Sequence, residues 1–152
     1  MRAQSQDEAR DEQRAQYLRA IFDAFPVAAF VVDNDVRIQD FNTAAEQLLG
    51  PEPAMALHRR GGEALHCIHA ETNGCGKAEF CCDCIIRNGV NRAFATQETR
   101  RERHHAELRT KKGVTAIDLL VTVSLLPYTE EPRALLILEN APPIRSRSKA
   151  SV

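Results

Sequence analysis

All five cysteines of this 152-residue chain lie between Cys67 and Cys84, and this cluster constrains the fold more than any other feature of the sequence. The N-terminus is polar and charged, and the chain contains no run of about 20 apolar residues, so we expect a cytoplasmic protein. Thiols stay reduced in that compartment, and an odd number of cysteines cannot all pair. The cluster therefore indicates metal binding or redox chemistry rather than a disulfide framework.

The spacing of the cysteines predicts four ligands for one metal centre. Cys81 and Cys84 form a Cys-x-x-Cys pair where a loop enters a predicted helix, and such a pair can direct two sulfurs to one ion. The N-terminus of that helix would lower the pKa of a thiol and so favour the thiolate that a metal requires. With two earlier cysteines the spacing becomes C-x7-C-x5-C-x2-C, and the predicted ligands are Cys67, Cys75, Cys81 and Cys84.

The residues around these ligands have several interpretations. Glycines on both sides of Cys75 allow the tight backbone that turns its sulfur inward. Cys82 is the spare thiol, because adjacent residues rarely point at one site, but it could exchange roles with Cys81. His69 could replace one thiolate, although a hydrogen bond from this histidine to a sulfur or a carbonyl is the simpler interpretation. The other histidines are expected to be solvated or packing side chains (His58, His66) or to be exposed in a charged stretch (His104, His105).

The period of the apolar residues predicts strands in two groups, with helices before and between them. We expect helices at 5–25, 44–49 and 83–96 and strands at 27–32, 36–41, 107–110, 114–126 and 133–139. Thr43 and Glu46 have the spacing of a capping box before the second helix, and Cys84 falls in the first turn of the third. This order predicts an α+β fold, an antiparallel sheet with helices gathered on one face.

The predicted N-terminal helix combines a charged part with a short apolar stripe. Residues 1–17 are expected to form a charged helical extension. The apolar side chains near one face come after it, at Leu18, Ile21, Phe22 and Phe25. Such a helix serves as a connector or a dimerisation arm, or lies solvated on its own domain. At the other end, residues 141–152 contain too few apolar side chains to pack and are expected to be disordered.

Several fragments, in the predicted order, resemble the PAS domain family. They are Ile21-Phe22-Asp23-Ala24-Phe25-Pro26, Val31-Val32-Asp33, Val36-Arg37-Ile38, Phe41-Asn42-Thr43-Ala44-Ala45-Glu46 and Leu48-Leu49-Gly50. They look like the family's leading helix, its first hairpin and the Asn-x-Ala-Ala opening of the next helix. The resemblance covers residues 18–140 and implies a PAS-like five-stranded antiparallel sheet with short helices on one face, an N-terminal helix, and a cysteine-rich insert at 62–84.

The insert is itself similar to a cysteine-rich variant of PAS domains in bacterial sensory proteins. The shared pattern is Leu-x-Cys-x-His, then Gly-Cys-Gly, then Cys-x-x-Cys. This resemblance implies a sensory or regulatory domain, and some PAS sensors hold an oxygen-labile iron–sulfur cluster on four cysteines. Zinc in a closed Cys₄ site is the alternative, because both centres need four thiolates. A sensor gains a signal from a redox-active centre, so the iron–sulfur cluster is the favoured cofactor.

Charge and motif content argue against several other functions. Lys and Arg number 20 against 21 Asp and Glu, so the chain has no cationic field that would attract nucleic acid or an anionic membrane. No catalytic triad order, phosphate loop or paired-carboxylate motif stands out, so the chain is not expected to be an enzyme. Output would then pass through a protein partner such as a signalling kinase or a regulator, with the N-terminal helix as a route to a homodimer.

Two alternatives stay open at this point. The first is a protein-interaction module in which a structural Cys₄ zinc site ties down the long loop. The second is a metal-free thiol switch at Cys81 and Cys84, which the missing βαβ pattern disfavours.

Overall fold

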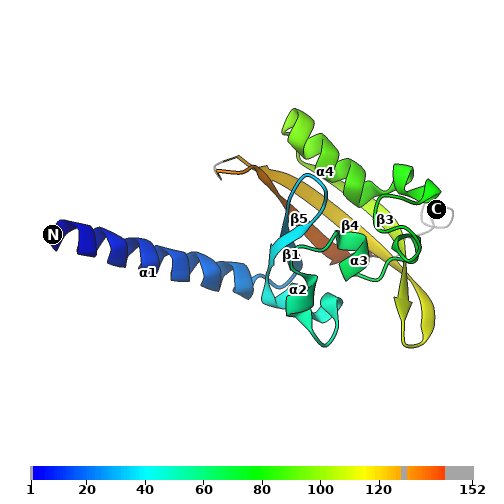
Figure 1. Cartoon of the computed structure of the whole chain (residues 1–152), viewed down its shortest axis with the longest axis horizontal. Helices are drawn as coiled ribbons and strands as arrows, with labels where there is room; N and C mark the ends of the chain where they lie inside the picture. The colour runs from blue at the N-terminus through cyan, green and yellow to red at the C-terminus, as the bar shows by residue number, and fades with distance from the viewer. Residues whose placement is uncertain (1, 128–129, 143–152) are drawn as a thin grey trace, which may run out of the picture.

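Five antiparallel strands form a single sheet in the order β2-β1-β5-β4-β3 (Figure 1). The computed structural model describes residues 2–127 and 130–142. Every neighbouring pair of strands is antiparallel. The strands are β1 (Ala28–Val32), β2 (Ile38–Phe41), β3 (Arg100–Thr110), β4 (Gly113–Leu126) and β5 (Arg133–Asn140).

Short helices fill the long connection between β2 and β3 and cover one face of the sheet (Figure 1). They are α2 (Thr43–Leu49), α3 (Gly61–Ala64) and α4 (Ile85–Thr96), with the 3₁₀ turns η1 (Pro53–Ala56), η2 (Ile68–Ala70) and η3 (Glu79–Asp83). The predicted α+β fold, with helices on one face and a helix at the N-terminus, is therefore confirmed.

The core lies between this helical layer and the sheet. Val90 and Ala93 of α4 are fully buried in the same apolar cluster as Val121 and Val123 of β4. Gly89 lets the helix come this close, because a Cβ atom there would lie 3.0 Å from a methyl carbon of Val123. The packing of α4 on β4 positions the helix on the sheet. The first residues of α4 border the cysteine segment.

Helix α1 (Arg2–Ala24) is one continuous helix that projects from the sheet (Figure 1). It runs without a break through residue 17, where the sequence predicts the end of the charged extension. Arg19 holds its C-terminal end, with Nη1 2.8 Å from an Asp40 carboxylate oxygen and Nη2 2.9 Å from the Phe41 carbonyl oxygen. In the described residues, no helix is long and apolar enough to cross a membrane.

Several predicted element boundaries are wrong, each for a local reason. Strand β2 begins at Ile38 rather than at residue 36, because Val36 has a φ of 60° and belongs to the preceding turn. Strand β3 begins at Arg100 rather than at 107, since its charged first residues pair with β4 although they show no apolar alternation. Helix α4 begins at Ile85, with Cys84 as its N-cap rather than in its first turn. From residue 143 onward, the tail expected to be disordered lies outside the described residues.

The cap of α2 is Asn42 and not Thr43, so the predicted capping box is also wrong. The Asn42 side chain is fully buried, and its Oδ1 accepts hydrogen bonds from the backbone N–H groups of Ala45 and Ala29, both at 3.0 Å. Its Nδ2 donates to the Val27 carbonyl oxygen at 2.9 Å. One side chain thus joins the start of α2 to the first strand of the sheet.

Replacement of this side chain should destabilise the domain strongly. We expect Asn42→Ala to lower the free energy of unfolding by about 3 kcal/mol, because three hydrogen bonds are lost and the Ala29 N–H stays buried without its acceptor. Urea unfolding followed by circular dichroism measures the change. Asn91→Ala, at an exposed position of α4, is the control and should shift the value by no more than about 0.5 kcal/mol. Equal effects of the two substitutions would contradict the role given to Asn42.

Candidate metal centre

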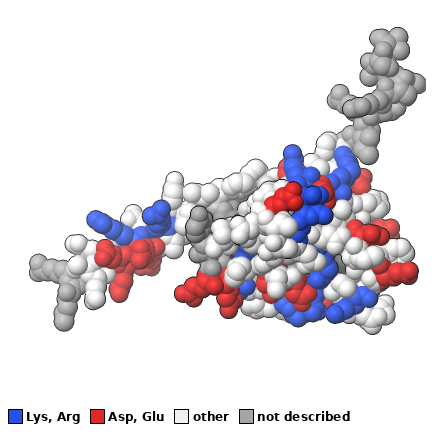
Figure 2. Space-filling view, turned by 90° about the horizontal axis from the view of Figure 1, so that it is seen from above, with Lys and Arg blue, Asp and Glu red and all other residues white. Residues whose placement is uncertain are grey.

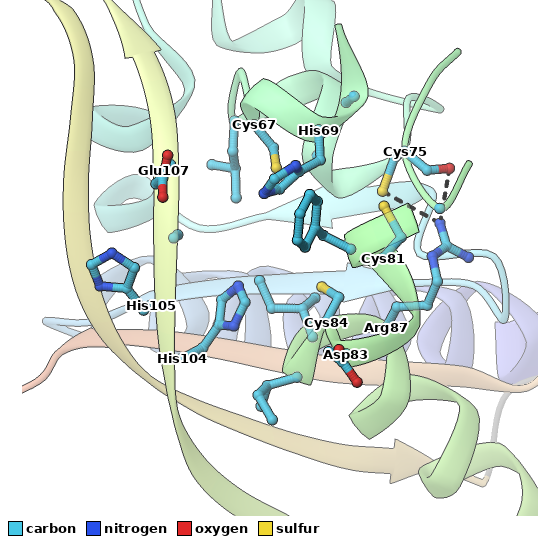
Figure 3. A pocket seen from close by; sticks show the side chains of 18 of the residues that line it. Cys67, His69, Cys75, Cys81, Asp83, Cys84, Arg87, His104, His105 and Glu107 are labelled. Carbon is cyan, nitrogen blue, oxygen red and sulfur yellow. Dashed lines mark hydrogen bonds between the residues drawn. The ribbon is translucent and has the colours of Figure 1, made fainter. Parts of the chain in front are cut away.

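Four cysteines line one cavity of about 400 Å³ between the cysteine segment, the start of α4 and strand β3 (Figure 3). They are the four predicted ligands, Cys67, Cys75, Cys81 and Cys84. Each of the four is partly buried, whereas Cys82 is exposed. The Cys82 thiol lies 3.1 Å from the Glu79 carbonyl oxygen, to which it donates, and it does not line the cavity.

Local backbone geometry brings the first two sulfurs together. Cys67 is the N-cap of η2 and forms a β-bridge with Leu108, which ties it to strand β3. Cys75 stands between two glycines with φ values of 91° and 85°, as the sequence predicts for a tight turn. Gly62 gives them room, because a Cβ atom there would lie 3.0 Å from the Cys75 sulfur and 3.4 Å from the Cys67 Cβ.

The other two cysteines lie just before α4. Cys81 lies in the turn η3, and the Cys84 N–H donates to the Cys81 carbonyl oxygen at 3.2 Å. The Asn88 side chain closes this corner by donating to the Cys82 carbonyl oxygen at 2.9 Å. The turn therefore directs Cys81 and Cys84 to the cavity and leaves the residue next to Cys81 outside.

Burial raises the pKa of the Cys84 thiol, so the expectation that the helix N-terminus lowers it is wrong. The backbone N–H groups of Ile86 and Arg87 do favour the thiolate, but desolvation outweighs them. Burial raises the pKa of Cys67 in the same way, against the N–H groups of His69 and Ala70. Each of these sulfurs thus has amide groups two and three residues further along that stabilise its charged form.

Arg87, in the first turn of α4, supplies a cation to a third sulfur. Its Nη2 lies 3.3 Å from the Cys75 sulfur and 3.4 Å from the Cys75 carbonyl oxygen (Figure 3). Its Nη1 donates to an Asp35 carboxylate oxygen at 3.0 Å. Burial opposes ionisation of Asp35, but hydrogen bonds from Arg87 and Arg60 outweigh it and lower the pKa of this carboxyl group.

Three histidines border the cavity beside the sulfurs, His69, His104 and His105. The ring of His69 lies against that of Phe80, with 5.2 Å between their centroids. His104 on β3 is half-buried and borders the cavity, so the expectation that it is exposed is wrong. Burial, with His105 and His69 nearby, lowers the pKa of His104 and favours its neutral form. His105 is exposed as expected, with its Nδ1 2.8 Å from Asp118.

The chemistry of the cavity suits a thiolate-bound metal group. In residues 2–127 and 130–142 no three His, Cys, Asp or Glu side chains come close enough to hold one ion. A single zinc ion would need its sulfurs within about 4 Å of one another, since each Zn–S bond is about 2.3 Å. Within the described part of the chain, Arg87 Nε is also the one buried side-chain polar atom without a hydrogen-bond partner, beside this cavity.

Three residues of this site have no role there that the sequence predicts: Asp35, Arg87 and His104. Asp35 lies between the predicted strands 27–32 and 36–41, and Arg87 lies within the predicted helix at 83–96, with no role expected for either. Their contact joins positions 52 residues apart, so no local pattern marks it. His104 did carry a signal, because Ala106 and Leu108 follow it at alternate positions, as inward-facing strand residues do.

The comparisons with known proteins address the fold as a whole. Residues 16–85 match the sequence profile of the PAS domain family. The PAS domain of an HTR-like protein from Haloarcula marismortui has a TM-score of 0.60 and 18% identity, over 90% of this chain and 99% of that one. The chain has the fold of a PAS domain. The PAS domain of nitrogen regulation protein NR(II) from Vibrio parahaemolyticus gives 0.58 and 15%, over 81% and 96%.

A third PAS domain, from Bordetella pertussis BvgS, gives a TM-score of 0.58 and 16% identity, over 91% of this chain and 92% of that one. No curated protein sequence matches the chain. At these identities the structural neighbours establish the PAS fold alone. They say nothing about the function of the cysteine cavity.

The positions of the thiols predict how metal-free protein reacts with iodoacetamide. Cys82 should be alkylated first because it is exposed, and Cys67 and Cys84 should be slow because burial limits access and raises their pKa. For the same reason, their rates should keep rising at pH values above the ordinary pKa of a thiol. Peptide mass spectrometry at several pH values measures each rate. Equal rates at Cys82 and Cys84 would contradict the arrangement.

Proposed function

We propose that this PAS domain is a sensory signalling domain whose four cavity-lining cysteines hold an iron–sulfur cluster. The observation that carries the proposal is the set of donors around the sulfurs. Amide groups stabilise the thiolate forms of Cys67 and Cys84, and the Arg87 guanidinium contacts the Cys75 sulfur. Thiolates held in this way are the ligands of iron–sulfur clusters and of structural zinc.

A sensory role favours the cluster over zinc, because a redox-active centre supplies a signal. The described residues contain no group of three ligands at single-ion distance, and the four cysteines share a cavity of about 400 Å³. The walls are largely apolar, with Leu65, Ala106 and Leu119 buried among them. When bound there, a cluster supplies a redox-sensitive centre whose potential depends on such burial and on hydrogen bonds to sulfur.

The relatives of the fold support a signalling role through a protein partner. A PAS domain from a two-component sensor histidine kinase has a TM-score of 0.57 to this chain at 8% identity. The nitrogen regulation protein NR(II) also contains such a domain. We therefore assign to this chain a sensory rather than a catalytic role, with a kinase or regulator as its output.

Metal analysis of anaerobically purified protein tests the cluster. We expect iron and acid-labile sulfide together with sulfide-to-iron charge-transfer absorbance. Serine substitution at each of Cys67, Cys75, Cys81 and Cys84 should abolish the absorbance, because serine is a poor ligand for this centre. Cys82→Ser is the matched control and should retain it, since Cys82 lies outside the cavity.

Two results would overturn the cluster. Stoichiometric zinc without iron would replace it with a structural Cys₄ site, and the domain would then be an interaction module. Protein without metal that forms a disulfide between Cys81 and Cys84 on oxidation would instead favour the thiol switch. Loss of iron in Cys82→Ser but not in Cys81→Ser would keep the cluster and exchange the roles of these two residues.

We also propose that α1 pairs with α1 of a second copy of the chain. Four large apolar side chains near its C-terminal end are exposed, Tyr17 by 67%, Leu18 by 57%, Ile21 by 42% and Phe25 by 48%. Leu18, Ile21 and Phe25 have the three- and four-residue spacing of a helix-pairing stripe. Figure 2 shows charges of both signs on the outer part of the helix. A two-fold axis would place identical stripes against each other.

Sedimentation velocity over a range of concentrations tests the pairing. Leu18→Glu combined with Ile21→Glu should weaken dimerisation by roughly a hundredfold or more, because two charges would face the interface. Gln16→Glu combined with Ala20→Glu adds the same charge on the opposite side of α1 and should leave the dimer intact. A wild-type chain that sediments as a monomer at every concentration would contradict the proposal.

A further inference from the structure

Arg87 joins two segments that are distant in the sequence, the cysteine loop and the turn between β1 and β2. Its Nη2 contacts both the sulfur and the carbonyl oxygen of Cys75, at 3.3 and 3.4 Å. Its Nη1 and Nη2 contact the carboxylate and the carbonyl oxygen of Asp35, at 3.0 and 3.4 Å. Only 16% of the Arg87 side chain is exposed. A single guanidinium is therefore shared between the candidate metal ligand and the turn.

The guanidinium is also fixed by packing on the cysteine loop. Gly76 follows Cys75, and a Cβ atom at Gly76 would lie 2.6 Å from both Cζ and Nε of Arg87. The planar group thus lies directly against the glycine, and a side chain at this position would have to push the guanidinium away. A movement of Cys75 and Gly76 must displace the Arg87 head group or break its contacts.

The turn that contains Asp35 has a strained backbone held by side-chain hydrogen bonds, so displacement of Arg87 can change its conformation. Asp33 Oδ1 accepts hydrogen bonds from the backbone N–H groups of Asp35 and Arg37, both at 2.9 Å. Between them, Val36 has a φ of 60°, a strained value for a β-branched residue. Arg60 donates to the other Asp35 oxygen at 2.8 Å. Arg37 Nε lies 3.5 Å from this second oxygen, so three arginines help to hold the turn in this conformation.

Strand β2 leads from this turn to the base of α1. The strand follows the turn at Ile38 and contains Asp40, whose carboxylate binds Arg19 of α1 at 2.8 Å. Close to the same end, the Thr43 N–H donates to Asp23 of α1 at 3.2 Å. A change in the turn can therefore reach α1 along four residues of one strand.

We infer that Arg87 transmits the occupancy of the four-cysteine cavity to the β1–β2 turn, and through β2 to α1. The inference rests on the proposed function, because it takes the cavity as a metal centre. A metal group bound by Cys75 would fix its sulfur and keep Arg87 between Cys75 and Asp35. Loss of the group frees the cysteine loop, and Arg87 and the turn then lose a fixed neighbour.

Hydrogen–deuterium exchange of loaded and metal-free protein tests this link. In the wild type, amide exchange at residues 33–37 should be slower in the loaded protein by roughly tenfold, the scale of one charge-assisted hydrogen bond. Arg87→Gln removes a donor from the Cys75 sulfur and should lower the metal content, and its loaded and metal-free forms should exchange residues 33–37 at the same rate. Arg92→Gln is the control, because Arg92 lies on the same helix but outside the cavity, 3.9 Å from Glu102. It should behave as the wild type.

A difference of wild-type size in metal-loaded Arg87→Gln would overturn the inference. A second comparison needs no metal, and so separates failure of the link from failure of the cluster. In metal-free protein, Cys75→Ala should speed exchange at residues 33–37 when Arg87 is present and have no effect in the Arg87→Gln background. An equal effect in both backgrounds, or none in either, would overturn the link whatever the metal analysis finds.

Discussion

The cost of ionising a thiol in a partly buried cavity shapes the cysteine segment. Burial disfavours the thiolate forms of Cys67 and Cys84, so the surrounding backbone must supply donors. The N-terminal turns of η2 and α4 provide amide groups to these two sulfurs, and Arg87 provides a cation to Cys75. The short 3₁₀ turns of the segment are therefore useful because they orient N–H groups, whereas α4 and the sheet carry the core.

The fold could be predicted where apolar residues alternate or repeat within one element. In β4, Leu119, Val121 and Val123 are buried in alternation, and the same pattern is visible in the sequence. The first part of β3 escaped prediction because charged side chains occupy it, and its pairing with β4 is what makes it a strand. The α2 cap was missed for a related reason. Asn42 serves both the helix and Ala29, a contact that exists only in the folded chain.

In the candidate site, too, local sequence features could be predicted and contacts that depend on packing could not. Cysteine spacing and the glycines around Cys75 are local features, and they predict which sulfurs the structure brings to one cavity and that Cys82 stays outside. The pKa of Cys84 could not be predicted from its place at a helix start, because the opposing desolvation depends on what packs over it. Arg87 and Asp35 could not be paired from sequence for a similar reason, since only the packing of α4 on the sheet brings them together.

Because Arg87 contacts both Asp35 and Cys75, the position of its guanidinium depends on the cysteine loop and on the β1–β2 turn together. The Asp35 carboxylate and the Cys75 sulfur bind different nitrogens of the same planar group, so its position reflects both. Asp35 keeps two further cations, Arg60 and Arg37, whereas the side-chain donor that contacts the Cys75 sulfur in the described part of the chain is Arg87. The β1–β2 turn can thus remain folded while the hydrogen bond between Asp35 and Arg87 strengthens or weakens. Under the proposed link, the state of the partly buried Cys75 sulfur would alter this edge of the sheet without unfolding the core.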